Sequence, residues 1–140
     1  MFVIIVGAGR VGATIAKRML GEGHEVSVID EDPLSLEKLE VGLSGSWEDA
    51  GGRFTLGTAL EVEALLAGGI ENADVLCCTT NGDNTNLVVA QIAQKRFNVA
   101  KVIVRVLDPG RAEWYGRQGL HTICPTQHAI EMFEEAVLAP

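Results

Sequence analysis

The chain has 140 residues, which is enough for one domain of ordinary size and too few for two. Hydrophobic residues make up 47% of it, and this excludes a disordered protein or a linker. Its 11 basic and 19 acidic residues give a net charge of −8, and a net-acidic surface repels phosphate backbones, so no nucleic-acid partner is expected. An anionic ligand would need a local site with backbone N–H donors or arginines of its own.

The sequence predicts neither an export signal nor a membrane span. The N-terminal apolar run, residues 2–6, is too short for a signal peptide and has no basic residue before it. No stretch approaches the roughly 20 apolar residues that cross a bilayer. The cysteines Cys77, Cys78 and Cys124 are odd in number and form no C-x-x-C motif, which is typical of buried small hydrophobes in a reducing compartment. We therefore expect a cytoplasmic protein.

The first half of the chain alternates short β-branched runs with helical patterns. We expect strands at residues 2–6, 25–30 and 53–56. Apolar spacing predicts helices over 11–20 and 59–67, and Asp32-Pro33, with aspartate as N-cap and proline at the first position, predicts a short helix between them. Residues 41–52 contain four glycines and are expected to form an irregular loop.

The second half repeats this alternation. We expect strands at 74–79, 101–106 and 121–124, and helices over 84–97, 111–118 and 126–138, the last capped by Thr126. Six strand–helix units predict an α/β fold, a doubly wound parallel six-stranded Rossmann sheet in the order 3-2-1-4-5-6 with helices on both faces. Residues 1–140 are expected to form this single domain.

A glycine-rich loop follows the first predicted strand. Gly7, Gly9 and Gly12 form the pattern G-x-G-x-x-G at the start of a helix, and Asp30 ends the second predicted strand 18 residues after Gly12. Gly7 permits the tight turn, Gly9 lets a pyrophosphate approach the backbone, and Gly12 lets the helix pack on the strand. Asp30 can accept hydrogen bonds from both hydroxyls of an adenosine ribose and would repel a 2′-phosphate, which disfavours NADP. The alternative is a Rossmann fold that keeps these glycines for packing only.

The chain lacks the groups that a dehydrogenase needs for hydride transfer. Its one tyrosine, Tyr115, is followed four residues later by Gly119, so the Tyr/Lys pair of short-chain dehydrogenases is absent. His24, His121 and His128 are separated, and none lies beside a serine or cysteine in a nucleophile motif. We expect no catalytic residue and no metal site, and interpret the chain as a nucleotide sensor without chemistry of its own.

Several segments together resemble one family. They are residues 5–12 (Ile-Val-Gly-Ala-Gly-Arg-Val-Gly), 28–33 (Val-Ile-Asp-Glu-Asp-Pro), 69–74 (Gly-Ile-Glu-Asn-Ala-Asp), 80–87 (Thr-Asn-Gly-Asp-Asn-Thr-Asn-Leu) and 104–109 (Val-Arg-Val-Leu-Asp-Pro). The chain resembles the TrkA-N domain, also called the RCK or KTN domain, from about residue 2 to the last helix. The resemblance implies a cytosolic regulatory subunit that binds an adenine nucleotide and gates a membrane potassium transporter or channel. Such domains form dimers that assemble into rings.

The resemblance also implies roles for particular residues. Gly7, Gly9, Arg10, Val11 and Gly12 would surround the phosphates, and Asp30 would hold the ribose. Thr79, Thr80 and Asn81 follow the fourth predicted strand, across the crevice where the strand order reverses.

The resemblance also bears on the Gly57-Thr58 pair and on Arg105. The family usually has Gly-Asp near the adenine after the third strand, but here the pair is Gly57-Thr58, so a carboxylate facing the base is missing. Arg105 is a charge in an apolar strand. It either pairs with a nearby carboxylate or reaches a phosphate of its own or a neighbouring subunit.

Three questions stay open at this point. The ligand could be NAD, NADH, ATP, ADP or AMP, because the loop and Asp30 recognise a moiety that these share. The alternative functions are a stand-alone NAD-dependent oxidoreductase and the regulator of a different cation transporter. The small C-terminal ligand domain of many relatives is not found in these residues, which fits either a minimal subunit or a truncated one.

The last predicted helix carries an apolar stripe. Ile130, Phe133 and Val137 share one side of it, flanked by Met132, Ala136 and Leu138. The stripe either packs on the sheet of its own chain or lies buried in a partner subunit. The resemblance, in which the last helix crosses to a neighbour, favours a dimer contact.

Overall fold

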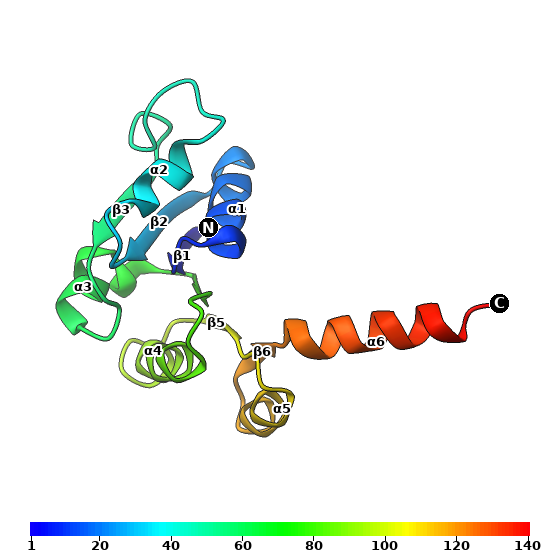
Figure 1. The fold of residues 1–140 in the computed structure, drawn as a ribbon. Coiled ribbons are helices and arrows are strands. Elements are labelled where there is room, and N and C mark those ends of the chain that lie inside the picture. The colour runs from blue at the N-terminus through cyan, green and yellow to red at the C-terminus, as the bar shows by residue number, and fades with distance from the viewer.

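The computed structural model describes residues 1–140 and contains one six-stranded sheet (Figure 1). Its strands are β1 (Phe2–Val6), β2 (Glu25–Asp30), β3 (Arg53–Leu56), β4 (Val75–Cys78), β5 (Lys101–Arg105) and β6 (His121–Ile123). They lie in the order β3-β2-β1-β4-β5-β6, and every neighbouring pair is parallel. The predicted doubly wound Rossmann sheet is therefore confirmed.

Six α-helices accompany the sheet, and all but the last cover one of its two faces. They are α1 (Arg10–Gly21), α2 (Ser35–Glu40), α3 (Val62–Ala67), α4 (Asp83–Lys95), α5 (Pro109–Arg117) and α6 (Pro125–Leu138), with a short 3-10 turn, η1 (Ile70–Asn72). Side chains from α3, α4 and α5 join the larger core on one face of the sheet. Those from α1 and α2 join the smaller core on the other face. Alternate residues of each central strand feed these two cores, as expected for a sheet buried on both sides.

Several predicted helix boundaries were wrong. The short helix after β2 begins at Ser35, because the Asp32 carboxylate accepts a hydrogen bond from the Leu34 N–H (2.9 Å) and holds a turn instead of capping a helix. The helix predicted from residue 59 begins at Val62. Cys124, not Thr126, is the N-cap of α6: its Sγ accepts from the Gln127 N–H, and Pro125 occupies the first helical position.

The loop over residues 41–52 contributes a core residue that the sequence did not indicate. Trp47 is 1% exposed and packs in the smaller core. Its indole N–H donates to the Arg53 carbonyl (3.0 Å), and its backbone N–H donates to a Glu40 carboxylate oxygen (2.7 Å). A Cβ added at Gly52 would overlap the indole ring, so this loop is irregular in backbone but closely packed.

Helix α6 projects away from the sheet (Figure 1). None of its residues is buried, and the exposed fractions of Phe133 and Val137 are 73% and 78%. This excludes the alternative in which the stripe packs on the sheet of its own chain. No helix combines the length and the apolar character that crossing a membrane would require.

Candidate functional site

A cavity of about 380 Å³ opens at the carboxyl ends of the strands, between β1 and β4, where the strand order reverses. Parallel α/β sheets bind ligands at this position. Of the residues expected at the site, the lining includes Gly7, Gly9, Asp30, Gly57, Thr58, Thr79, Thr80 and Asn81. Arg10, Val11, Gly12 and Arg105 do not line the cavity itself.

The three loop glycines differ in what requires them. Gly7 has φ +95°, and a Cβ there would lie 2.9 Å from the Thr80 nitrogen. A Cβ at Gly12 would overlap the Gly7 carbonyl oxygen. Gly9 has an ordinary φ of −75°, and a Cβ there would meet no atom within 4 Å. The protein's own packing therefore explains Gly7 and Gly12 but not Gly9.

Two helices begin at the cavity. Gly9 is the N-cap of α1 and Gly82 is the N-cap of α4, both line the cavity, and neither supplies a side chain to cap its helix. The first backbone N–H groups of a helix have no partner within it, and the helix dipole favours negative charge there. The crevice thus offers two groups of backbone donors to an anion.

Asp30 lies at the end of β2 and holds the loops around it. One carboxylate oxygen accepts from the Ala8 N–H (2.7 Å), and the other accepts from the Asp32 N–H (2.8 Å). Each oxygen retains a lone pair for a ligand hydroxyl. Asp30 is therefore placed both to shape the glycine loop and to face a polar ligand.

Lys38 also lines the cavity, although the sequence did not indicate it. It is the one lysine or arginine of the lining and lies on α2, three residues after the buried Ser35. Positions i and i+3 share a side of a helix. That spacing could have indicated Lys38 once Ser35 was known to face inward, but burial of Ser35 comes from tertiary packing.

Thr79 joins the two central strands at their ends. Its hydroxyl lies 2.9 Å from the Gly7 carbonyl oxygen and 3.1 Å from that of Val6, and its backbone N–H donates to the Val6 carbonyl (2.8 Å). The side chain is 8% exposed. Thr79 therefore fixes the glycine loop against β4.

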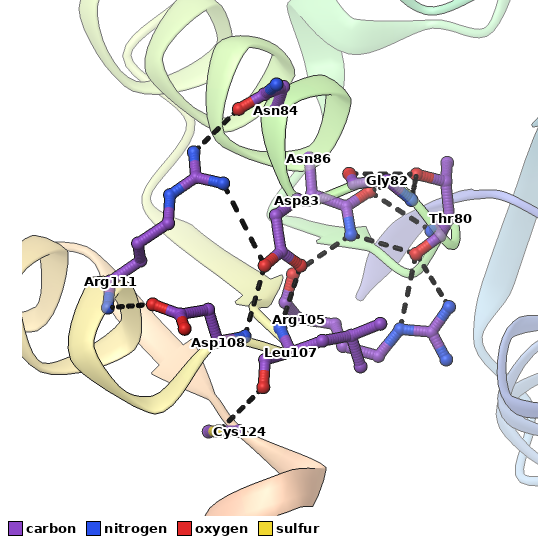
Figure 2. A network of polar contacts seen from close by, with 10 residues as sticks. All are labelled: Thr80, Gly82, Asp83, Asn84, Asn86, Arg105, Leu107, Asp108, Arg111 and Cys124. Atoms are coloured by element: carbon purple, nitrogen blue, oxygen red, sulfur yellow. Dashed lines mark hydrogen bonds and ion pairs between the residues drawn. The ribbon is translucent and has the colours of Figure 1, made fainter.

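The β4–α4 and β5–α5 loops are joined by a polar network (Figure 2). The Asp83 carboxylate accepts from the Leu107 N–H (2.7 Å) and the Asp108 N–H (3.1 Å). Arg111 donates to the Asn84 side chain (2.7 Å), and Asp108 caps α5 by accepting from the Arg111 N–H. These contacts explain why both loops carry distinctive polar segments.

Arg105 has no carboxylate partner, which excludes the ion-pair alternative. Its guanidinium donates to the Thr79 carbonyl (2.7 Å), the Thr80 carbonyl (2.6 Å) and the Asn81 side-chain oxygen (3.1 Å). It therefore lies behind the cavity wall and holds the residues that form it.

A second concave surface lies on the other side of Arg105. This groove, of about 360 Å³, is mostly apolar and is lined by Met1, Val3, Val11, Ile15, Met19, Val75, Cys77, Cys78, Thr79, Lys101, Ile103, Arg105, Ile123 and Pro125. It runs between α1 and the sheet face of β4, β5 and β6. Burial raises the pKa of the Cys77 thiol from 9.0 to about 11, an effect that the nearby Lys101 ammonium partly offsets. The thiol is therefore protonated and unreactive near neutral pH.

No cluster of three histidine, cysteine, aspartate or glutamate side chains that could hold a metal ion occurs in the structure. The cavity is instead lined by glycines, hydroxyl groups and carboxylates beneath helix N-termini. Together with the sheet order, this arrangement defines a Rossmann-type nucleotide-binding domain.

The family follows from comparison with known proteins. The family model of the TrkA-N domain matches residues 3–125, so the chain belongs to the TrkA-N family. It is 39% identical over 138 residues to the Trk system potassium uptake protein TrkA of Streptomyces coelicolor. That alignment covers 99% of this chain and 59% of the relative, so the chain spans well under two thirds of that protein's length.

Solved structures share the fold. The TrkA-N domain of the inner membrane protein ybaL from Escherichia coli has a TM-score of 0.80 at 18% identity, covering 99% of this chain and 96% of that one. The Shewanella denitrificans Kef C-terminal domain in its AMP-bound form has a TM-score of 0.76 at 23% identity, covering 98% and 80%.

Proposed function

We propose that this chain is the nucleotide-binding part of a cytoplasmic regulatory subunit of a potassium uptake system. Its family and the name of its Streptomyces coelicolor relative support potassium uptake as the process. The AMP-bound Kef domain, which has the same fold, supports an adenine nucleotide as the ligand. The subunit acts through binding rather than chemistry, and its membrane partner is a potassium transporter or channel.

The observation that carries nucleotide binding is the empty space beside Gly9. No backbone angle and no neighbouring atom requires glycine there, yet the residue lines the cavity at the N-terminus of α1. A side chain would occupy the space that a phosphate needs to reach the helix N–H groups. This open space at the start of α1 therefore supports a ligand that approaches the backbone of the loop.

A phosphate beside Gly9 also determines where the rest of the ligand would lie. The diphosphate lies over the N-terminus of α1, and the ribose hydroxyls bind Asp30 at the end of β2. The base lies toward Gly57 and Thr58, where Leu60 adds an apolar surface. Arg10 is exposed beside the glycine loop and closes on the phosphates from outside. AMP, ADP, ATP, NAD and NADH all contain the adenosine phosphate that this arrangement recognises.

We also propose that the subunit is a homodimer in which α6 of one copy covers the groove of the other. The stripe on α6 is exposed, and the groove is an apolar surface without a covering helix. Their charges are complementary, because the charged side chains of the groove are Lys101 and Arg105, whereas α6 carries Glu131, Glu134 and Glu135 and no lysine or arginine. Exposed apolar surfaces of this kind mark interfaces.

A thermal-shift panel with ATP, ADP, AMP, NAD and NADH tests the nucleotide proposal, with NADP as the comparison that Asp30 should disfavour. A ligand at 100 times its Kd adds about 2.7 kcal/mol to the free energy of unfolding, which raises Tm measurably. We expect a rise with at least one of the five ligands and a smaller one with NADP. An unchanged Tm with all five at millimolar concentration contradicts the proposal.

A further inference from the structure

Arg105 lies between the candidate nucleotide cavity and the apolar groove that the partner's α6 is proposed to cover. Along β5, Val102 and Val104 belong to the larger core, whereas Ile103 and Arg105 point to the opposite face, where they line the groove. Thr79 lines both the cavity and the groove. Two surfaces with different proposed ligands thus meet at this pair of residues.

The guanidinium of Arg105 binds the cavity wall from behind. Beyond the contacts of its Nη2 with Thr79, Thr80 and Asn81, its Nε donates to the Thr80 carbonyl (3.2 Å), a contact visible in Figure 2. Thr80 and Asn81 line the cavity. The position of this positive charge at the groove therefore depends on the conformation of residues that a nucleotide would touch.

Asn86 fixes the same peptide from the other side. Its Nδ2 donates to the carbonyls of Thr80 (3.0 Å) and Arg105 (2.9 Å), and its Oδ1 accepts from the Thr80 N–H (3.1 Å). Asn86 is 1% exposed and has all of these bonds inside the protein. The side chain of Asn86 thus joins the end of β5 to the β4–α4 loop.

We propose that Arg105 is a positioning residue that couples the two sites, so that a nucleotide and a second copy of this chain bind cooperatively. This inference rests on the proposed function. A nucleotide that contacts Thr80 and Asn81 holds the acceptors of the guanidinium in place, and the charge is then already ordered when an acidic helix covers it. Ordering by the first ligand lowers the entropic cost of the second. The coupling is reciprocal, since each ligand changes the affinity of the other by the same factor.

The dimer dissociation constant, measured by sedimentation with and without saturating ADP, tests the coupling. We expect ADP to strengthen the wild-type dimer by at least fivefold, within the range of known couplings. In Arg105→Met the effect of ADP should fall below twofold, whatever the absolute affinities. Lys101→Met is the matched control: this residue also lines the groove, on the same strand, but lies outside the cavity lining and should retain the wild-type ratio.

Two further variants keep the test decisive. If Arg105→Met does not fold, Arg105→Lys replaces it, because a lysine keeps the charge but has one ammonium on a flexible stem in place of the rigid planar guanidinium. Asn81→Ala, at an exposed position, should reduce the ratio by removing one acceptor. The inference is overturned if ADP strengthens the wild-type dimer by less than twofold, or if the Arg105 variant keeps the full wild-type effect of ADP. It is also overturned if the wild type never dimerises. Absence of ADP binding, together with a negative panel of the other nucleotides, contradicts the proposed function instead.

Discussion

One carboxylate oxygen of Asp30 accepts a hydrogen bond from the Ala8 backbone N–H at 2.7 Å. This contact ties the end of β2 to the middle of the glycine loop. The other oxygen accepts from the Asp32 N–H, so the side chain organises two loops of the cavity at once. Asp30 therefore has a structural task in addition to the ribose contact proposed for it.

Asp30→Ala should weaken adenine-nucleotide binding and also lower stability. A hydrogen bond to a charged group contributes about 1.5–3 kcal/mol, so we expect a loss of roughly 10- to 150-fold in nucleotide affinity by calorimetry. Losing the Ala8 and Asp32 contacts should also lower the midpoint of urea unfolding. Asp49→Ala removes a carboxylate from the 41–52 loop outside the cavity and should change neither quantity. An unchanged nucleotide affinity in Asp30→Ala would remove this residue from the site.

Gly9→Val should abolish nucleotide binding with little effect on folding. The added side chain enters open space, so the unfolding free energy should change by less than about 1 kcal/mol. Gly21→Val is the matched control, because Gly21 also has open space beside it but lies at the far end of α1. Calorimetry with ADP separates the two variants. Normal ADP binding by Gly9→Val would show that the loop is only structural.

Phe133→Glu should dissociate the dimer and leave the nucleotide cavity intact. It places a charge in the apolar stripe of α6, on a residue that is 73% exposed within its own chain. His128→Glu adds a charge on the opposite side of the same helix and should leave the dimer unchanged. Light scattering at tens of micromolar compares the three proteins. A monomeric wild type, or a Phe133→Glu chain that unfolds outright, contradicts the proposed interface.

Gly52→Ala should destabilise the fold through Trp47. The added Cβ overlaps the indole, and overpacking of a well-packed core costs about 1–3 kcal/mol. Gly45→Ala, in the same loop, would make only an ordinary contact with Asp49 at 3.6 Å and serves as the control. Urea unfolding followed by Trp47 fluorescence, in a Trp114→Phe background that removes the exposed indole, measures both changes. Equal stability of the two variants would show that the loop adapts to the extra carbon.

The strand order and the crevice could be predicted from the sequence because they depend on periodicity and chain order. Apolar runs on both faces mark central parallel strands, and right-handed crossovers leave few ways to connect them. Carboxyl ends of parallel strands meet at one edge, so Gly7, Gly9, Asp30 and Thr79 had to converge. Helix starts were less predictable, because Asp32 and Cys124 can cap either a turn or a helix, and the surrounding packing decides between the two.

The fold, the glycine loop and the carboxylate at the end of β2 were all predictable, because each is set by residues close together in the chain or by strand polarity. Packing between distant segments sets the partners of Arg105, the burial of Trp47, the place of Lys38 in the cavity lining and the exposure of α6. A sequence pattern can show that an apolar or charged residue needs a partner. It does not show which atoms that partner provides. For Arg105 these were carbonyl oxygens 25 and 26 residues away in the chain, which no local signal could indicate.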